Sequence, residues 1–448
     1  NVQITDHKKL LPKDGIFAAT ATLGGVEYKG MLYIGLRPSI ESATERRVEI
    51  HLFDFDRQIY DQDITVEIYK FIRGDRKFPS MEGLKSAMAE DELTVRKSFR
   101  GSLSAQADVA TVIPNYNGKN FLELFLPFFR SSRFPNEKIY VADNASTDGS
   151  VKWLKSTYPD IECISLSKNA GYAGGYNEAL SRIQAKYYAL VNSDIEITSQ
   201  WLQPIIEMME KDPTIAAVQP RILAESKRGY FEYAGAAGGF MDSLGYPFCR
   251  GRVLQNLERD TGQYESAIPI FWASGAALVI RSDAFHEMGG FDPDYFAHQE
   301  EIDLAWRLLL RNYKIMSCPQ SVVYHVGGGT LSYSSPEKIY LNFRNNLITL
   351  FKYLPKPDFI PVVSLRWIFD GFAGLRFMAK GQFANAFAII RAHYYIYGHI
   401  RSILQKRKDL GEEFTRQPLA KLPGVYQGSI IMDYYLRWKR KFSDLFPS

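Results

Sequence analysis

The chain has little cysteine. Only Cys163, Cys249 and Cys318 occur in its 448 residues, and no two of them share a Cys-x-x-Cys spacing. Disulfide-rich secreted domains and structural zinc sites need cysteines in pairs or clusters, so this usage argues against both. A reducing compartment fits best, and we expect a cytoplasmic protein.

Long apolar runs and strong net charge are missing as well. No charge-free run reaches the roughly 20 residues of a membrane-spanning helix, and no basic-then-apolar signal segment opens the chain. The formal net charge of +4 is too small over this length to indicate nucleic acid as a partner. The first residue is Asn1 rather than methionine, so we expect a truncated or processed start.

Length and composition are those of a folded protein with more than one domain. The hydrophobic fraction is 46% and the charged fraction 23%, both ordinary for globular proteins. A chain of this length suggests two or three domains, each with its own core. The pattern of apolar residues predicts four segments: a β domain over 1–97, a linker over 98–107, an α/β domain over 108–339 and a helical tail over 340–448.

The first segment predicts antiparallel β structure. Short alternating runs over 15–22, 26–36, 47–55 and 63–72 are separated by polar turns, which is typical of a small barrel-like fold. An amphipathic helix is predicted over 81–97. From residue 109 onward strands alternate with helical patterns, which predicts a Rossmann-type, mainly parallel sheet.

Three polar motifs follow buried runs in this second domain. They are residues 143–148 (Asp-Asn-Ala-Ser-Thr-Asp), 169–177 (Asn-Ala-Gly-Tyr-Ala-Gly-Gly-Tyr-Asn) and 192–196 (Asn-Ser-Asp-Ile-Glu). The carboxyl ends of parallel strands open on one crevice where ligands bind. We therefore expect a nucleotide-diphosphate site at these three motifs.

Asp194 and Glu196 are the candidate metal ligands. Two carboxylates at one strand end can bind a hard cation such as Mg²⁺ or Mn²⁺, which would neutralise charge on a departing diphosphate. An ordinary turn leading into the next helix is the alternative. The position of the pair after two similar loops favours the metal site.

The other two loops have the same double interpretation. Asp143 either contacts a ligand or belongs to a turn that caps the next helix. The glycines of 169–177 permit close backbone approach at a helix start, where phosphate or sugar hydroxyls can bind. Tyr116, after the first strand, either stacks on a nucleobase or packs as an ordinary aromatic.

A second acidic group lies much further along the chain. Glu300, Asp303 and Arg307 fall near one helical face by their spacing, and Glu301 points elsewhere. A carboxylate here can act as general base, and capping or surface ion pairing is the alternative. His325 is either a metal or phosphate contact or a structural histidine.

Residues 108 to about 345 resemble the family-2 glycosyltransferases of GT-A fold, especially bacterial rhamnosyltransferases. The resemblance rests on the order of seven motifs: 112–117 (Val-Ile-Pro-Asn-Tyr-Asn), 143–148, 169–177, 192–194, 273–276 (Ala-Ser-Gly-Ala), 289–292 (Gly-Gly-Phe-Asp) and 300–303 (Glu-Glu-Ile-Asp). It implies transfer of a sugar, with inversion, from a nucleotide-diphosphate sugar to a hydroxyl of a glycan or lipid-linked acceptor.

The resemblance also implies residue roles. By the resemblance Tyr116 and Asp143 contact the base, Asp194 and Glu196 bind the metal, and the Glu300-Glu301 pair supplies the catalytic base. Beside these roles, the further candidates are Pro114, Asn169, Gly171, Asn177 and Ser193 for donor binding, His325 for metal binding and Asp303 for catalysis. The sequence departs from the common pattern twice, because Glu196 stands where Asp is commoner and the pair Glu300-Glu301 replaces Glu-Asp.

The helical tail carries aromatic and basic residues among its apolar ones. Helices of this kind within 340–397 either lie in a membrane interface or pack on the catalytic domain as amphipathic core helices. The first alternative predicts a peripheral location on the inner face of the cell membrane. A membrane surface is then a partner.

The first 97 residues resemble the riboflavin kinase module of bacterial bifunctional FAD synthases. The resemblance rests on residues 9–17, 30–38, 47–55 and 71–78. It implies that Glu49 is the base toward riboflavin and that Asn1 ends a metal and phosphate motif whose other residues are absent. We expect this module to fold poorly or to lack kinase activity. Riboflavin kinase activity and non-catalytic nucleotide-sugar binding are the alternatives to sugar transfer.

Overall fold

The computed structural model describes most of the chain. The described residues are 12–23, 26–35, 46–53, 55, 59, 62–74, 87–88, 91–92, 94–95, 107–132, 134–327, 335–411 and 417–446. They divide into two compact units, Asn1–Gln106 and Ala107–Ser448. Each unit has hydrophobic clusters of its own.

The first unit contains a four-stranded antiparallel sheet in the order β3-β2-β1-β4. Its strands are β1 (Gly15–Leu23), β2 (Val26–Gly35), β3 (Arg47–Leu52) and β4 (Thr65–Gly74). Side chains alternate between the two faces, so Ile16 and Ala18 pack with Val95 while Phe17 and Ala19 pack in another cluster. The predicted antiparallel β domain is confirmed.

Three predictions for this unit fall wholly or mostly outside the described residues. They concern Asn1, the linker over 98–107 and the helix over 81–97. Within that predicted helix, the described residues 87–88, 91–92 and 94–95 are helical.

The second unit is built on an eight-stranded sheet in the order β7-β6-β5-β8-β15-β10-β16-β9. Its strands are β5 (Ala107–Asn115), β6 (Glu137–Asp143), β7 (Glu162–Ser165), β8 (Ala185–Val191), β9 (Ile195–Ile197), β10 (Ile215–Ala224), β15 (Ala277–Arg281) and β16 (Lys314–His325). β15 and β9 run against the other six. The predicted α/β fold with a mainly parallel sheet is therefore confirmed, and the ends of β5, β6, β8 and β16 meet at one edge.

Helices cover both faces of this sheet. They are α2 (Lys119–Ser131), α3 (Ser150–Thr157), α4 (Gly171–Leu180), α5 (Gln203–Lys211), α6 (Ser282–Glu287) and α7 (Glu300–Leu310). Alternate residues of each strand enter different clusters: Val109 and Ile113 of β5 pack in one, whereas Ala110 and Val112 pack in the other. Burial on both faces explains the nearly continuous apolar runs of these strands.

A second, five-stranded sheet joins the middle of the chain to its end. Its order is β14-β13-β12-β11-β17, with β11 (Gly239–Asp242), β12 (Pro247–Cys249), β13 (Arg252–Val253), β14 (Asn256–Leu257) and β17 (Val425–Tyr426). The backbone N–H of Ile430 donates to Asp242 at 3.0 Å. The last helices, α11 (Ile430–Tyr435) and α12 (Phe442–Leu445), are thereby held against this sheet.

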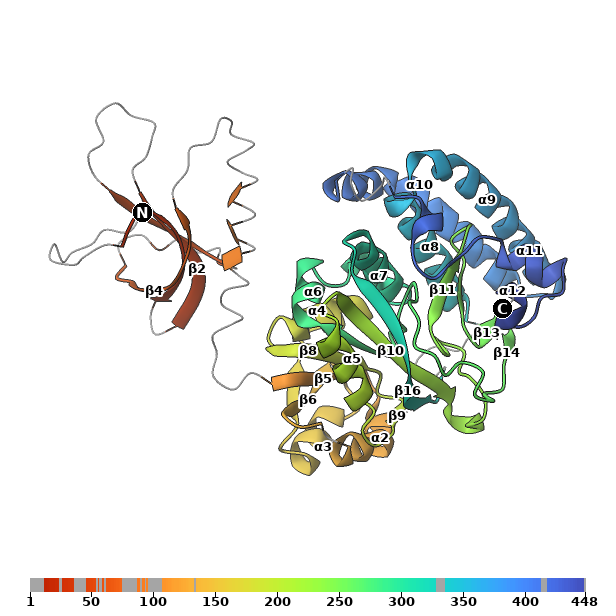
Figure 1. Cartoon of the computed structure of the whole chain (residues 1–448), viewed down its shortest axis with the longest axis horizontal. Coiled ribbons are helices and arrows are strands. Elements are labelled where there is room, and N and C mark those ends of the chain that lie inside the picture. Colours follow the sequence, from red (N-terminus) through yellow and green to blue (C-terminus); the bar gives the residue numbers. More distant parts are fainter. Residues whose placement is uncertain are drawn as a thin grey trace. The chain divides into compact units, whose positions relative to one another are not determined.

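Three long helices follow the main sheet in the sequence. They are α8 (Pro336–Tyr353), α9 (Lys356–Ala379) and α10 (Phe383–Asp409), and α9 and α10 lie at the end of the unit opposite α2 and α3 (Figure 1). α8 is buried over most of its length, whereas α9 and α10 each bury only a few residues. In the part of the chain that is described, no helix is long and apolar enough to cross a membrane.

Candidate active site

The loops after β5 and β6 interlock at the sheet edge. Asn115 donates to the Asp143 carboxylate at 2.8 Å and to the Ser150 hydroxyl at 2.8 Å. The second oxygen of Asp143 accepts the backbone N–H of Ser146 at 3.1 Å. Asp143 is buried, so its carboxylate fixes the shape of this loop as well as facing the crevice edge.

Tyr116 lies beside this buried cluster and is exposed. Its side chain retains 47% of its accessible surface, and it directly follows β5. Pro114, on β5 and shortly before Tyr116, is half-buried. Ser193, which follows β8, is also half-buried. An exposed aromatic ring beside fixed polar groups is suited to stacking on a flat ligand.

The glycine-rich loop packs against the backbone of the segment that precedes α7. Gly171 has φ +73° at the start of α4, and a Cβ there would lie 2.5 Å from the Phe296 carbonyl oxygen. The N–H of Tyr172 donates to that same oxygen at 2.7 Å. The close approach that the glycine permits is therefore made by the segment preceding α7.

Asn177 binds this segment from the other end of the motif. Its side chain donates to the Phe291 carbonyl at 2.7 Å and accepts the Phe291 N–H at 2.9 Å. Asn169 is exposed, and its side chain accepts the Gly171 N–H at 2.9 Å. The motif thus positions residues 291–299, from which the acidic helix begins.

α8 holds the same segment from its other side. Phe296, His298 and Gln299 all have positive φ, a conformation that costs energy for residues other than glycine. Asn345 compensates by donating to the carbonyls of Ala297 at 2.9 Å and His298 at 2.6 Å. Sequence reasoning missed Asn345, because it assigned the Phe-Arg-Asn-Asn run to the tail.

Glu300 and Glu301 begin α7, where Glu300 is buried and Glu301 is half-buried. Glu300 is 3% exposed, and its Oε2 has no hydrogen-bond partner. Burial, followed by the nearby Glu301 charge, raises the pKa of Glu300 well above its ordinary value. Burial raises the pKa of Glu301 to about 7. Both carboxyl groups thus take up a proton more readily than an exposed glutamate does, a property that suits a group exchanging protons near neutral pH.

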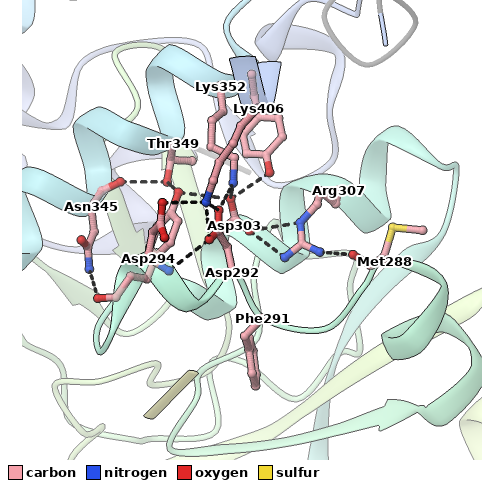
Figure 2. Close-up of polar contacts among 12 residues, drawn as sticks. Met288, Phe291, Asp292, Asp294, Asp303, Arg307, Asn345, Thr349, Lys352 and Lys406 are labelled. Carbon is pink, nitrogen blue, oxygen red and sulfur yellow. Dashed lines mark hydrogen bonds and ion pairs between the residues drawn. The ribbon is translucent and has the colours of Figure 1, made fainter. Parts of the chain in front are cut away.

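Asp303 lies one turn further along, in an ion network (Figure 2). One oxygen accepts from Arg307 at 2.6 Å, and the other contacts Lys352 and accepts from Tyr353 at 2.8 Å. Lys352 also binds Asp292 at 2.9 Å. Burial opposes ionisation of Asp303, but the charges of Lys352 and Arg307 outweigh it and hold its pKa well below the usual range. Its lone pairs are occupied by structural partners, which leaves Glu301 as the acidic group able to accept a proton.

Asp194 and His325 meet at the same sheet edge. His325 is the last residue of β16, and its Nε2 lies 3.3 Å from Asp194 Oδ1. Its Nδ1 lies 3.1 Å from Glu232 Oε2. Burial lowers the pKa of His325, but the hydrogen bonds and charges of Asp194 and Glu232 outweigh burial and raise it to about 10. Glu232 was not singled out from the sequence, since it lies in a stretch without periodic pattern.

Glu196 takes a different partner. It lies on β9 between the buried residues Ile195 and Ile197, and Arg228 donates to its carboxylate at 2.7 Å. In the described ranges, no three His, Cys, Asp or Glu side chains form a group that could hold a metal. The donors brought together are the carboxylate of Asp194 and the imidazole of His325. The Asp194 carboxylate is of the kind that binds a divalent cation, whereas His325, whose pKa its carboxylate partners raise to about 10, would have to lose its ring proton before it could bind one.

The metal-side and base-side carboxylates act on one buried group. Burial raises the pKa of the Cys249 thiol, and the charges of Glu232 and Glu301 raise it further, against the lowering charge of Arg252. Glu232 contacts His325, which contacts Asp194. Glu232, which contacts His325, and Glu301 therefore both lie within electrostatic range of the Cys249 thiol.

Two family models match separate parts of the chain. Residues 111–289 match the model described as "Glycosyl transferase family 2", and residues 1–99 match the model described as "Riboflavin kinase". The chain carries a family 2 glycosyltransferase domain. It carries a riboflavin kinase domain ahead of it, so both predicted resemblances are confirmed.

Curated relatives align with each part. The glycosyltransferase domain is similar to N-acetylglucosaminyl-diphospho-decaprenol L-rhamnosyltransferase of Mycobacterium tuberculosis, at 24% identity over 233 residues, 49% of this chain and 76% of the relative. The riboflavin kinase domain is similar to the bifunctional riboflavin kinase/FMN adenylyltransferase of Pseudomonas fluorescens, at 30% identity over 96 residues, 21% of this chain and 30% of the relative. The chain thus spans under a third of that second relative.

Solved glycosyltransferase structures also align with this chain. One is GalNAc-T7 with UDP, GalNAc and Mn²⁺, with a TM-score of 0.44 and 14% identity over 56% of this chain and 49% of that one.

Proposed function

We propose that the family 2 glycosyltransferase domain moves a sugar from a nucleotide-diphosphate sugar to a hydroxyl of a glycan or lipid-linked acceptor. The observation that carries this proposal is the Asp194–His325 pair at 3.3 Å at the sheet edge that also carries the Asp143 loop. A site that cleaves a sugar from a diphosphate needs a cation site beside a pocket for the nucleotide.

Asp194 is the proposed protein ligand of Mg²⁺ or Mn²⁺, joined by His325 once its ring has lost a proton, with Glu196 near them but paired to Arg228. The bound cation would neutralise the charge that builds on the departing diphosphate. Tyr116, Pro114, Asp143 and Ser193 are proposed to contact the donor directly. Asn169, Gly171 and Asn177 support the site from behind, by positioning the segment before α7.

Glu301 is the proposed general base. As its carboxylate takes the acceptor hydroxyl proton, the acceptor oxygen bonds to the anomeric carbon and the bond from that carbon to the diphosphate breaks. The electron pair of the broken bond leaves with the nucleotide diphosphate, and attack from the opposite side inverts the anomeric configuration. Glu300 stays protonated beside the base, and Asp303 anchors the helix that presents both.

The decisive experiment screens nucleotide sugars for metal-dependent thermal stabilisation, hydrolysis and transfer. Asp194→Asn should lower the transfer rate by at least about a hundredfold, because the diphosphate charge loses its metal-assisted stabilisation. Glu225→Gln is the control, because it also removes one carboxylate charge near this region. Glu225 lies 3.8 Å from Arg228, the residue that binds Glu196, but it belongs to no acidic motif. Full activity in Asp194→Asn would rule out this metal assignment. Donor binding without transfer or hydrolysis would favour a nucleotide-sugar binding protein instead.

A second prediction concerns the nucleobase. Tyr116→Ala should raise the KM for the donor about threefold to tenfold, because ring stacking is worth roughly 0.5–1.5 kcal/mol beyond area burial. The kcat should change little, since the base does not react. Tyr116→Phe keeps the ring and is the control. An unchanged donor KM in the alanine variant would contradict stacking at this position.

Phosphorylation of riboflavin, with Glu49 as base, is the alternative activity that the riboflavin kinase domain offers, and FMN formation by this chain would overturn our expectation that the module lacks it. Glu49 lies on β3 and is half-buried, and its strand neighbour across the sheet is Tyr33 on β2. Incubating the full chain with riboflavin, ATP and Mg²⁺ and measuring FMN tests this activity. Glu49→Gln distinguishes it from sugar transfer, which that substitution should leave unchanged.

A further inference from the structure

The outer side of α9 carries a continuous apolar stripe. Ile360, Ile368, Phe372, Leu375 and Met378 are all exposed, and their spacings of three, four and eight residues place them on one face of the helix. Phe372 retains 62% of its accessible surface. The opposite side buries Val362, Arg366 and Asp370, so α9 has apolar character on the face turned away from the protein.

α10 repeats this arrangement. Phe383, Phe387, Ile390, Tyr394 and Tyr397 are exposed at alternating spacings of four and three residues. The stripes of α9 and α10 meet, because the Trp367 ring lies 5.5 Å from the Tyr397 ring. We call the two stripes together the α9–α10 face. Single exposed apolar residues are common, but a contiguous patch of this kind indicates a binding surface.

The exposed charges that α9 and α10 themselves carry up to residue 408 are cationic, and the acidic neighbour Glu337 of α8 pairs with one of them, Arg391, at 2.6 Å. Between residues 359 and 408 the sole acidic residue in the sequence is Asp370, which is buried and lies against Arg366 and His393. The same span contains the exposed cations Arg376, Lys380, Arg391, Arg401 and Lys408. An apolar face rimmed by cations is complementary to anionic lipid headgroups above acyl chains.

A second copy of the chain is a poorer occupant. In a symmetric dimer the same patch faces itself, so the cations of α9 and α10 in one copy would meet those of the other, and between residues 359 and 408 no exposed acidic residue offsets them. Aromatic rings with a polar atom, such as Trp367, Tyr394 and Tyr397, favour the boundary between headgroups and acyl chains. The long stems of lysine and arginine can lie along the apolar region while their charges reach the headgroups.

We propose that the α9–α10 face docks in the plane of an anionic lipid bilayer (Figure 1). The surface extends onto the last helices, because Arg376 of α9 donates to the Tyr435 hydroxyl of α11, and Leu436 and Trp438 beside it are exposed. Docking would bring the glycosyltransferase domain to the surface where a lipid-linked acceptor resides. It requires neither donor nor metal, so it stands independently of the proposed sugar transfer.

Flotation of the full chain with lipid vesicles tests this proposal. Without nucleotide or metal, the protein should float with vesicles of phosphatidylcholine and phosphatidylglycerol, and less with phosphatidylcholine alone. The double substitution Phe372→Asp and Phe387→Asp should lower the vesicle partition coefficient at least about tenfold, since each ring contributes burial in the interface. Lys380→Glu with Arg401→Glu should remove the preference for anionic lipid. Leu124→Asp on α2, where Leu124 is equally exposed at 61%, should change neither.

Three results would overturn the proposal. The first is parent protein that stays in solution with anionic vesicles, and the second is equal flotation of the Phe372/Phe387 variant. The third is a dimer in solution that this variant dissociates, without vesicle binding. If the variant does not fold, quenching of tryptophan fluorescence by brominated lipid in the parent protein replaces it. Quenching should diminish in Trp367→Phe, and its absence in the parent protein contradicts docking.

Discussion

Glu301→Gln is expected to lower kcat for sugar transfer by about a hundredfold to ten-thousandfold, the usual contribution of a positioned general base. The glutamine keeps the size of the side chain but cannot accept the acceptor proton. Donor binding should be nearly unchanged, because the proposed donor contacts lie in other loops. Steady-state kinetics with the acceptor, alongside calorimetric titration of the donor, separates the two effects.

The pH profile gives an independent check of the same group. Since burial raises the pKa of Glu301 to about 7, a base at this position holds its proton at lower pH. The kcat should therefore fall about tenfold per pH unit as the pH drops below about 7. Glu301→Asp is the conservative comparison, and it should keep a pH-dependent residual rate. A parent profile that is flat from pH 5 to 8 would argue against Glu301 as the base.

Asp303→Asn is expected to destabilise the second unit by about 3–5 kcal/mol, because it leaves the buried Arg307 without its carboxylate partner and Lys352 with Asp292 alone. Arg307 and Lys352 both lie against Asp303 and are themselves buried. Denaturant unfolding of the purified chain, followed by tryptophan fluorescence, measures the change. Asp212→Asn is the matched control, since Asp212 pairs with Lys314 at an exposed site, and its effect should be much smaller.

The pH dependence of stability has a definite sign at Asp303. Its pKa is held below the ordinary value near 3.9 by Lys352 and Arg307, which outweigh the opposing effect of burial. The ionised carboxylate therefore contributes its full stabilisation above that ordinary pKa, and the contribution is lost as the pH falls below it. Asp303→Asn should lose this acid-sensitive contribution. An unchanged unfolding free energy would show that the network of Figure 2 contributes little to stability.

Much of the α/β architecture could be predicted from local sequence. The apolar runs before residues 143, 169 and 192 are strands or strand ends in the structure, because strands buried on both faces leave an unmistakable pattern. The antiparallel first unit was predicted from a different signal, the alternation of apolar and polar residues between polar turns. The spacing of Asp303 and Arg307 likewise gave their contact directly, since residues four apart on a helix are neighbours.

Long-range pairing was beyond the sequence pattern. Nothing local shows that His325 reaches Asp194, because that contact depends on β16 lying between β10 and β9 in the sheet. Glu232 and Asn345 were missed because neither lies in a motif with a recognisable spacing. For the tail helices, both alternatives hold in part: α8 packs as a core helix, whereas α9 and α10 leave apolar stripes exposed.

The sequence by itself determined the two families, the order of the polar motifs and the class of the sheet, because these depend on residue type and on periodicity along the chain. The tertiary structure decided which acidic residues bind a proton readily and which stay ionised. It buried Glu300 and half-buried Glu301 in a setting that raises both pKa values, and it surrounded Asp303 with cations from α7 and α8 that lower its own. A carboxylate's proton affinity depends on neighbours that only folding brings together. The carboxyl groups of Glu301 and Asp303 therefore have pKa values shifted in opposite directions, although both lie in the first turn of α7.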